Sequence, residues 1–272
     1  MTDETIAPEP AVDEVLLNVT PEGVAVVTLN RPRVHNAFNA ELVQKLGEIF
    51  DDLEDQDGVR VVIIEGAGKS FSAGGDLAAM KNDVNISESE VRDESGNFAF
   101  MLMKLRGLPM PSVALVHGAA LAGGMGLVAA CDMAICTADA TFGLSEVRIG
   151  LIPAIISPYV SEAIGPRATR RYALSGERFG ADEALRLGLV HAVVPDQNAL
   201  AAESEKLVTA LLAGAPGALT ATKELLDLVT YMPIDEDLQE ETTAMIAERR
   251  VSDEAKEGFA AFLEKRKPGW VV

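Results

Sequence analysis

Short β-rich runs alternate with helical segments over the first 195 residues of the chain, and every segment after that point has a helical pattern. A run of Val, Ile and Thr between turn residues predicts a strand, whereas apolar residues three or four apart predict an amphipathic helix. The first two strands flank Pro21-Glu22-Gly23 as a hairpin, and Asn39 is a good N-cap for the next helix. Because the order is β-β-α and not a regular βαβ series, we predict an α/β fold that differs from a doubly wound nucleotide-binding sheet.

The expected organisation has three parts. Residues 1–12 are acidic and carry two prolines, which predicts a loose tail. Residues 13–195 are expected to form an α/β core, and residues 196–272 a helical region without strands. The expected strands cover 15–19, 24–29, 59–65, 112–117 and 133–136, and the expected helices cover 40–50, 98–106, 123–130, 200–213, 218–228, 235–249 and 253–265.

Composition excludes several classes of function. Of the 272 residues, 48% are hydrophobic and 24% are charged, which is ordinary globular usage. The formal net charge is -19 and aromatic residues are 5%, so we expect neither a nucleic-acid partner nor an anionic membrane partner. A polyanionic ligand would then require a local basic patch.

Neither the cysteines nor the histidines form a metal-binding pattern, and we expect no metal. Cys131 and Cys136 lie in an apolar run and are expected to be buried thiols, and the three histidines are scattered. The N-terminus carries no secretory signal, and no apolar stretch reaches the roughly 20 residues of a membrane-spanning helix. These features predict a cytoplasmic protein.

Two glycine clusters, residues 71–77 and 117–126, each follow a short strand and open a helix. A helix N-terminus carries unpaired N–H groups and the positive end of the helix dipole. Two such termini that converge would form an oxyanion hole, a pair of N–H donors for a developing negative oxygen. Tight turns and close helix packing are the alternative explanation, and composition alone favours it.

Glu146 is the one carboxylate in the nearly apolar stretch 140–153. Burial raises the pKa of a carboxylate, which suits a general acid or base near neutral pH. On spacing alone, however, an exposed glutamate that pairs with Arg148 is the better interpretation.

Together these segments resemble the enoyl-CoA hydratase/isomerase (crotonase) superfamily over nearly the whole chain. The resemblance implies an α/β, crotonase-like spiral of ββα turns with a C-terminal α-helical trimerisation region. It also implies an acyl-CoA thioester substrate, a role in fatty acid or branched-chain amino acid catabolism, and a homo-trimer or a dimer of trimers. No cofactor is implied, because coenzyme A is part of the substrate. The resemblance is carried by residues 29–37, 71–77, 118–126, 131–132, 142–153, 184–190 and 262–267, and segments 151–159 and 170–172 are most similar to bacterial methylglutaconyl-CoA-type hydratases.

The same resemblance implies roles for individual residues. The backbone N–H groups of Gly75 and Gly123 would be the oxyanion donors, and Glu146 would be the general acid/base. Arg31 would belong to the basic patch that a polyanionic ligand requires. The coenzyme A part of the substrate would be bound by a set of residues of which the last two come from a neighbouring or swapped C-terminal helix: Arg33, Val34, Ala73, Asp76, Leu77, Phe262 and Lys265.

Gly126 departs from the hydratase pattern, in which a second glutamate lies three residues after the residue matched by Gly123. One carboxylate can hydrate an enoyl-CoA if it handles the same water at both carbons, and it can equally shuttle a proton between C4 and C2. We therefore expect an enoyl-CoA hydratase-type enzyme that acts on a 2-enoyl, methylglutaconyl-like thioester through an enolate. A Δ3-Δ2-enoyl-CoA isomerase and a non-catalytic acyl-CoA binder are the alternatives.

Two further expectations concern mobility and assembly. The charged segment 81–97 has few apolar residues and follows the first glycine cluster, so it is expected to be a mobile lid at the mouth of the acyl pocket, with a solvated linker as the alternative. The helices after residue 195 carry apolar faces that need a covering surface, which predicts an oligomer unless they fold back on their own subunit.

Overall fold

The computed structural model describes residues 13–82 and 86–271, so the expected acidic tail over residues 1–12 lies outside the described residues. The main sheet has six strands in the order β1-β2-β3-β4-β6-β9. Strands β1 (Val15–Val19) and β2 (Val24–Leu29) pair antiparallel and form the expected hairpin. The other neighbours in this sheet pair in parallel, and their strands are β3 (Val61–Gly66), β4 (Ser112–Val116), β6 (Met133–Thr137) and β9 (Ala192–Val194).

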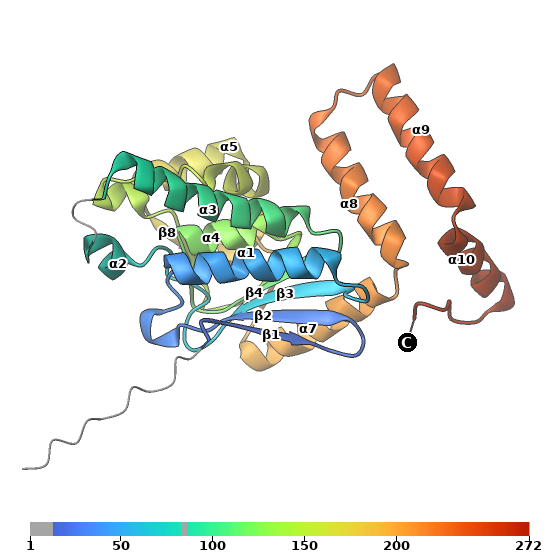
Figure 1. Cartoon of the computed structure of the whole chain (residues 1–272), viewed down its shortest axis with the longest axis horizontal. Helices are drawn as coiled ribbons and strands as arrows, with labels where there is room; N and C mark the ends of the chain where they lie inside the picture. The colour runs from blue at the N-terminus through green and yellow to red at the C-terminus, as the bar shows by residue number, and fades with distance from the viewer. Residues whose placement is uncertain (1–12, 83–85, 272) are drawn as a thin grey trace, which may run out of the picture.

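Both faces of the main sheet are covered, as parallel strands require. Figure 1 shows α1 (Ala40–Asp55) and α3 (Glu88–Gly107) above the sheet and α7 (Gln197–Leu212) below it. Successive residues of β3 therefore enter different cores: Val62 and Ile64 pack in the cluster under α1 and α3, whereas Val61 and Ile63 pack in the cluster that contains Leu200 of α7.

Helix α1 illustrates how the sequence determines these elements. Asn39 is its N-cap, and the Oδ1 atom of this residue accepts a hydrogen bond from the N–H of Leu42 at 2.8 Å. The helix then buries one stripe of apolar residues three and four apart against the sheet: Leu42, Val43, Leu46, Ile49, Phe50 and Leu53. The sequence-based expectation for this helix is confirmed.

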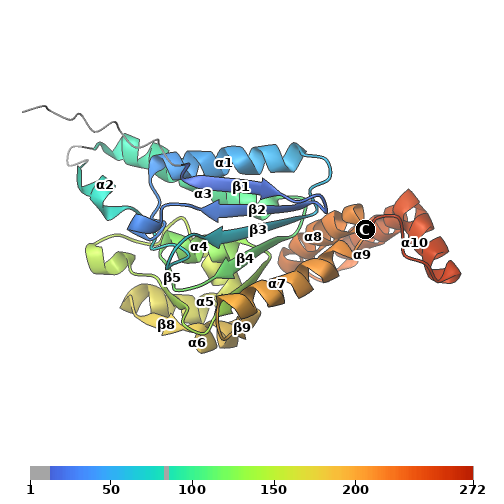
Figure 2. The ribbon, with the colours of Figure 1, turned by 90° about the horizontal axis from the view of Figure 1, so that it is seen from below.

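A second, smaller sheet forms beside the first. It joins β5 (Ala119–Leu121), β7 (Thr141–Gly143) and β8 (Arg178–Gly180), each of three residues. Strands β5 and β7 are parallel, whereas β7 and β8 are antiparallel. Around this sheet lie α4 (Gly123–Ala130), α5 (Ser157–Ser175) and α6 (Ala181–Leu187), seen from below in Figure 2.

The three last helices form an arm at one end of the molecule, as Figure 1 shows. They are α8 (Pro216–Tyr231), α9 (Glu236–Val251) and α10 (Asp253–Glu264), and with α7 they confirm the four helices expected after residue 195. Lys223 of α8 pairs with Asp132 at 2.8 Å. The guanidinium of Arg60 donates to the backbone oxygens of Leu212, Gly214 and Trp270, so a core strand residue anchors the base of the arm.

The expectation of a loop over residues 81–97 is wrong for most of its length. Helix α2 (Leu77–Asn82) reaches into it, and α3 begins at Glu88. A capping box explains the early start: Ser87 Oγ accepts from the N–H of Glu90, and the Glu90 carboxylate accepts from the N–H of Ser87. The charged residues of this segment therefore lie on the solvent face of a helix, and only residues 83–85 lie outside the described part of the chain.

Candidate active site

The two glycine clusters meet in space, as the oxyanion-hole hypothesis requires. Segment 70–75 lies beside β5, and the N–H of Leu121 donates to the backbone oxygen of Ser72 at 2.9 Å. A Cβ atom built on Gly74 would lie 2.8 Å from the Cβ of Ala122 and 3.5 Å from the backbone nitrogen of Gly123. The close approach, together with a φ of +90° at Gly74, explains why glycine is required there.

The backbone N–H groups of Gly75 and Gly123 donate to no acceptor within residues 13–82 and 86–271. Their neighbours are engaged, because the N–H of Asp76 donates to Phe38 and that of Ala122 donates to Gly143. Gly123 is the first residue of α4, where an unpaired N–H also carries the positive end of the helix dipole. Two adjacent segments thus present one free donor each.

The turn into α4 is strained at Ala122. This residue has φ 47° and ψ -120°, a backbone conformation that glycine adopts easily and that residues with a Cβ rarely adopt. Strain of this kind costs about 1–3 kcal/mol and persists where neighbouring structure imposes it. Here the imposed conformation determines the direction of the Gly123 N–H.

An aromatic pair borders the Gly123 amide. Phe38 and Phe98 pack edge to face with ring centroids 5.2 Å apart. A Cβ built on Gly123 would lie 3.1 Å from the ring of Phe98 and 3.3 Å from that of Phe38. The sequence analysis missed both residues, because Phe98 was assigned to the start of a helix with no role and its contact partner lies 60 positions earlier in the chain.

Glu146 is brought to this region by strand pairing. Leu121 of β5 pairs with Gly143 of β7, and Glu146 follows three residues later at the start of the short 3-10 helix η2 (Glu146–Ile149). Its Oε2 atom is buried without a hydrogen-bond partner among the described residues. Burial raises the pKa of the carboxyl group above its ordinary value. Glu146 is therefore not the exposed partner of Arg148 that spacing alone favoured; the Arg148 guanidinium donates instead to the backbone oxygen of Gly176.

Gly126 lies one turn further along α4, and no side chain fits there. A Cβ built on this glycine would lie 2.6 Å from the Cβ of Ile156, closer than real Cβ contacts. The Ile156 side chain is 3% exposed and fills the space in front of the helix. At this position the site has hydrocarbon in place of a second carboxylate.

Asp76 and Arg31 do not have the roles expected for them. Asp76 accepts hydrogen bonds from the N–H groups of Ala78 and Ala79, and it pairs with Arg31 at 3.1 Å. These backbone bonds and the guanidinium lower the pKa of the Asp76 carboxyl group. Arg31 also pairs with Glu14 at 2.8 Å. Both charges are therefore neutralised inside the fold, and Arg31 is not part of a free basic patch, which corrects the expectation.

The other residues expected to contact coenzyme A divide into two groups. Val34 and Leu77 are 41% and 54% exposed near the glycine segments, and Arg33 is exposed beside them on the short helix η1 (Pro32–Val34). Ala73 is half-buried, and its N–H donates to the backbone oxygen of His35. Phe262 and Lys265 lie instead at the end of α10, and Figure 1 shows that helix at the opposite end of the chain from α2. A single chain does not bring the two groups together.

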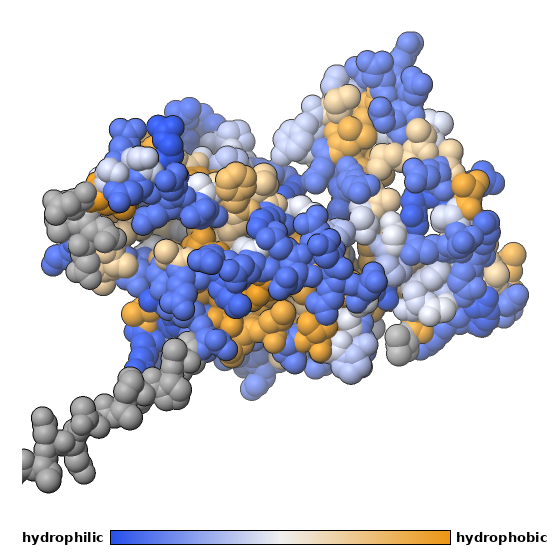
Figure 3. All heavy atoms as spheres, in the orientation of Figure 1, coloured by the Kyte–Doolittle hydropathy of each residue, from blue (hydrophilic) through white to orange (hydrophobic). Residues whose placement is uncertain are grey.

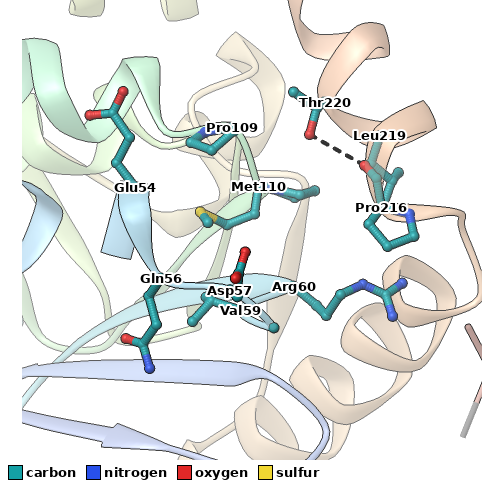
Figure 4. Close-up of a pocket in the computed structure, with 12 residues that line it drawn as sticks. Glu54, Gln56, Asp57, Val59, Arg60, Pro109, Met110, Pro216, Leu219 and Thr220 are labelled. Carbon is teal, nitrogen blue, oxygen red and sulfur yellow. Dashed lines mark hydrogen bonds between the residues drawn. The ribbon is translucent and has the colours of Figure 1, made fainter. Parts of the chain in front are cut away.

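A separate cavity of about 190 Å³ lies where the core meets α8 (Figure 4). Glu54, Arg60 and Met110 line it from the core, and Pro216 and Leu219 line it from α8. None of the glycine amides and not Glu146 borders it, so this cavity is a feature of the joint between core and arm.

Other kinds of centre are absent from the described parts of the chain. Over residues 13–82 and 86–271, no three His, Cys, Asp or Glu side chains gather as metal ligands. The two cysteines are buried, and burial raises the pKa of both thiols, that of Cys136 to about 12. Among the helices described, none is long and apolar enough to cross a membrane.

Comparison with known proteins gives a consistent result. The family profile described as enoyl-CoA hydratase/isomerase matches residues 19–271. A short-chain-enoyl-CoA hydratase of Clostridium acetobutylicum is 33% identical over 246 residues, which are 90% of this chain and 92% of that protein. A mitochondrial Delta(3,5)-Delta(2,4)-dienoyl-CoA isomerase of Dictyostelium discoideum is 30% identical over 90% of this chain and 86% of its own. The crystal structure of an enoyl-CoA hydratase from Shewanella pealeana is 36% identical with a TM-score of 0.90, covering 94% of this chain and 96% of that chain.

Proposed function

Because the chain belongs to the enoyl-CoA hydratase/isomerase family, we propose that it hydrates a 2-enoyl-CoA thioester through an enolate held by the Gly75 and Gly123 amides. The observation that carries this proposal is the conjunction of two adjacent, unpaired N–H donors with a buried, unpartnered carboxylate oxygen on Glu146. Each part alone has a structural explanation. Together they supply the oxyanion donors and the proton carrier that the reaction needs.

The amides would stabilise the charge that develops on the thioester oxygen. As water adds to C3, the electrons of the C2–C3 double bond move toward the carbonyl and form an enolate. Loss of one such donor typically costs about 2.7–4 kcal/mol of transition-state stabilisation. The free N–H at the start of α4 suits this task, because the helix dipole adds to the hydrogen bond.

Glu146 would carry the proton. Its carboxylate would take a proton from water as the water oxygen bonds to C3, and the resulting carboxylic acid would deliver that proton to C2 of the enolate. The net change is the addition of one water molecule across the double bond. The raised pKa of Glu146 suits both steps, because a proton carrier works best when its pKa approaches the working pH.

The wall formed by Gly126 and Ile156 favours isomerisation as a second candidate. With hydrocarbon in front of α4 and no second carboxylate at residue 126, one group would move all protons. In a 3-enoyl-CoA, Glu146 would remove a proton from C2, and the same acid would return a proton to C4 of the conjugated enolate. The Dictyostelium relative is named as an isomerase, which agrees with this chemistry within the family.

Finer features remain part of the proposal. We propose a methylglutaconyl-like acyl group, catalysis without a cofactor, and a cytoplasmic trimer or dimer of trimers. In the assembly, Phe262 and Lys265 of one copy would reach the coenzyme A bound beside Arg33, Ala73 and Leu77 of another. The support is that Phe262 is 83% exposed and distant from the site in its own chain.

A substrate panel tests the proposal. Purified protein is assayed with crotonyl-CoA and 3-methylglutaconyl-CoA for hydration and with a 3-enoyl-CoA for isomerisation. We expect turnover of at least one 2-enoyl-CoA. Turnover of the 3-enoyl-CoA alone would replace hydration by the second candidate. Binding of all three without turnover would leave a non-catalytic acyl-CoA binder.

A further inference from the structure

We propose that the methyl group of Ala122 is a spacer that fixes the Gly123 amide relative to the Gly75 amide, which makes Ala122 a positioning residue. This inference rests on the proposed function of the two amides. Its starting point is that a residue with a Cβ occupies φ 47° and ψ -120° between Leu121 and Gly123. Three glycines follow within four positions, so the chain uses glycine freely in this turn and nevertheless carries alanine at the strained position.

The backbone on both sides of Ala122 is held in place. Its N–H donates to the backbone oxygen of Gly143 at 2.8 Å, and its own carbonyl oxygen accepts from the N–H of Gly126 at 3.1 Å. The first bond ties the turn to the strand that precedes Glu146, and the second ties it to α4. These two bonds over-determine the conformation, which is the condition under which a strained residue persists.

The methyl group points at the other glycine segment. A Cβ built on Gly74 would lie 2.8 Å from the Cβ of Ala122, so the Ala122 methyl already occupies the space beside Gly74. Gly74 is itself held, because its carbonyl oxygen accepts from the N–H of Phe38 at 2.7 Å. The methyl therefore stands between the residue that precedes one donor and the residue that precedes the other.

This arrangement separates stability from activity in a way that simple space filling does not. Glycine at position 122 relieves the backbone strain, but it also removes the spacer and gives the Gly123 N–H more freedom. Donors of an oxyanion hole act because their positions are fixed before the reaction, and a displacement of about 1 Å can cost a hundredfold in rate. If the methyl only fills space, the substitution changes stability without a selective change in turnover.

The test compares Ala122→Gly with the matched control Ala129→Gly, which makes the same change in the last turns of α4. Each protein is assayed for melting temperature, for Kd of the acyl-CoA and for kcat on the substrate that the wild type converts. For Ala122→Gly we expect a melting temperature at or above that of the wild type, a Kd within about threefold and a kcat lowered by about tenfold to a hundredfold. For Ala129→Gly we expect a lower melting temperature, from the poorer helix propensity of glycine, and unchanged kcat.

An Ala122→Gly protein with wild-type kcat would overturn the inference while leaving the proposed function intact. A kcat loss accompanied by an equal loss of acyl-CoA binding would also overturn it, because the change would then be general damage to the site. Absence of turnover in the wild type itself would remove the proposed function, and the spacer role with it.

Discussion

The core and the arm differ in how completely one chain covers its apolar side chains. In the core, both faces of β3 are buried and α1 buries seven residues. In the arm, α8 buries no residue, α9 buries Leu238 and α10 buries Ala261. Figure 3 shows apolar side chains at the surface of the arm. The core is thus complete as a single chain, whereas the arm has the surface of an element that is built to be covered.

The difference has a consequence for the site. The amides and Glu146 belong to the complete part of the molecule, so their geometry is set within one chain. The residues expected to hold the distal part of coenzyme A belong partly to the arm. We infer that the chemistry depends on the core, and that affinity for coenzyme A depends on assembly.

Two leucine truncations test the comparison with the largest expected effect on stability. Leu46 is fully buried in α1, and Leu263 is 78% exposed on α10. We expect Leu46→Ala to lower the free energy of unfolding by about 2–5 kcal/mol, because it leaves a cavity in the core. We expect Leu263→Ala to change the free energy of unfolding of the single chain by less than about 0.5 kcal/mol.

Sedimentation of the same two variants sharpens the result. Leu263→Ala is expected to shift the assembly toward smaller species at micromolar concentration, whereas folded Leu46→Ala retains the assembly of the wild type. A wild-type chain that sediments as a monomer would show that nothing covers the arm, and the contrast between the two regions would lose its meaning for function.

The Gly126 and Ile156 contact gives the next largest effect, and it lies within the core. Gly126→Ala forces a methyl group against Ile156, and overpacking of this kind costs about 1–3 kcal/mol. Ile156→Gly removes the obstructing atoms, so the double variant is expected to recover part of the loss that Gly126→Ala causes. Chemical denaturation of the four proteins measures this coupling. Strictly additive losses in the double variant would contradict the packing described here.

The smallest expected effect is a pH dependence of stability that comes from Glu146. Burial raises the pKa of this group in the folded protein, so the folded state favours the protonated form. The carboxyl group is therefore well tolerated below its ordinary pKa, near 4.5, and destabilises the fold as the pH rises through the folded-state pKa. Glu146→Gln removes this penalty. We expect its melting temperature to exceed that of the wild type at pH 7 to 8, with the difference shrinking toward pH 4.

How far the sequence predicts the structure depends on how local the determining interactions are. Helix α1 and the β1–β2 hairpin follow from caps, turns and periodicity, and each was predicted. The start of α3 was missed because the charge of the segment outweighed the capping box at Ser87. The three-residue strands β5, β7 and β8 were also missed, because strands of this length exist only through their partners.

The same distinction applies to the candidate site. The two glycine segments and Glu146 were identified from motifs, and the structure brings these segments together. The neutralisation of Arg31 by Glu14 and Asp76 was not foreseen, because ion pairs between residues so far apart leave no local pattern. The plug that Ile156 forms in front of Gly126 is likewise a contact between elements.

The central claim is that Glu146 moves the proton while the amides of Gly75 and Gly123 hold the enolate. Glu146→Gln keeps the shape of the side chain and removes its ability to carry a proton, so it tests this claim most directly. We expect the variant to bind acyl-CoA with a Kd close to that of the wild type, and to lose turnover by about 10²–10⁴-fold. A Glu146→Gln protein that turns over acyl-CoA as fast as the wild type would contradict the account.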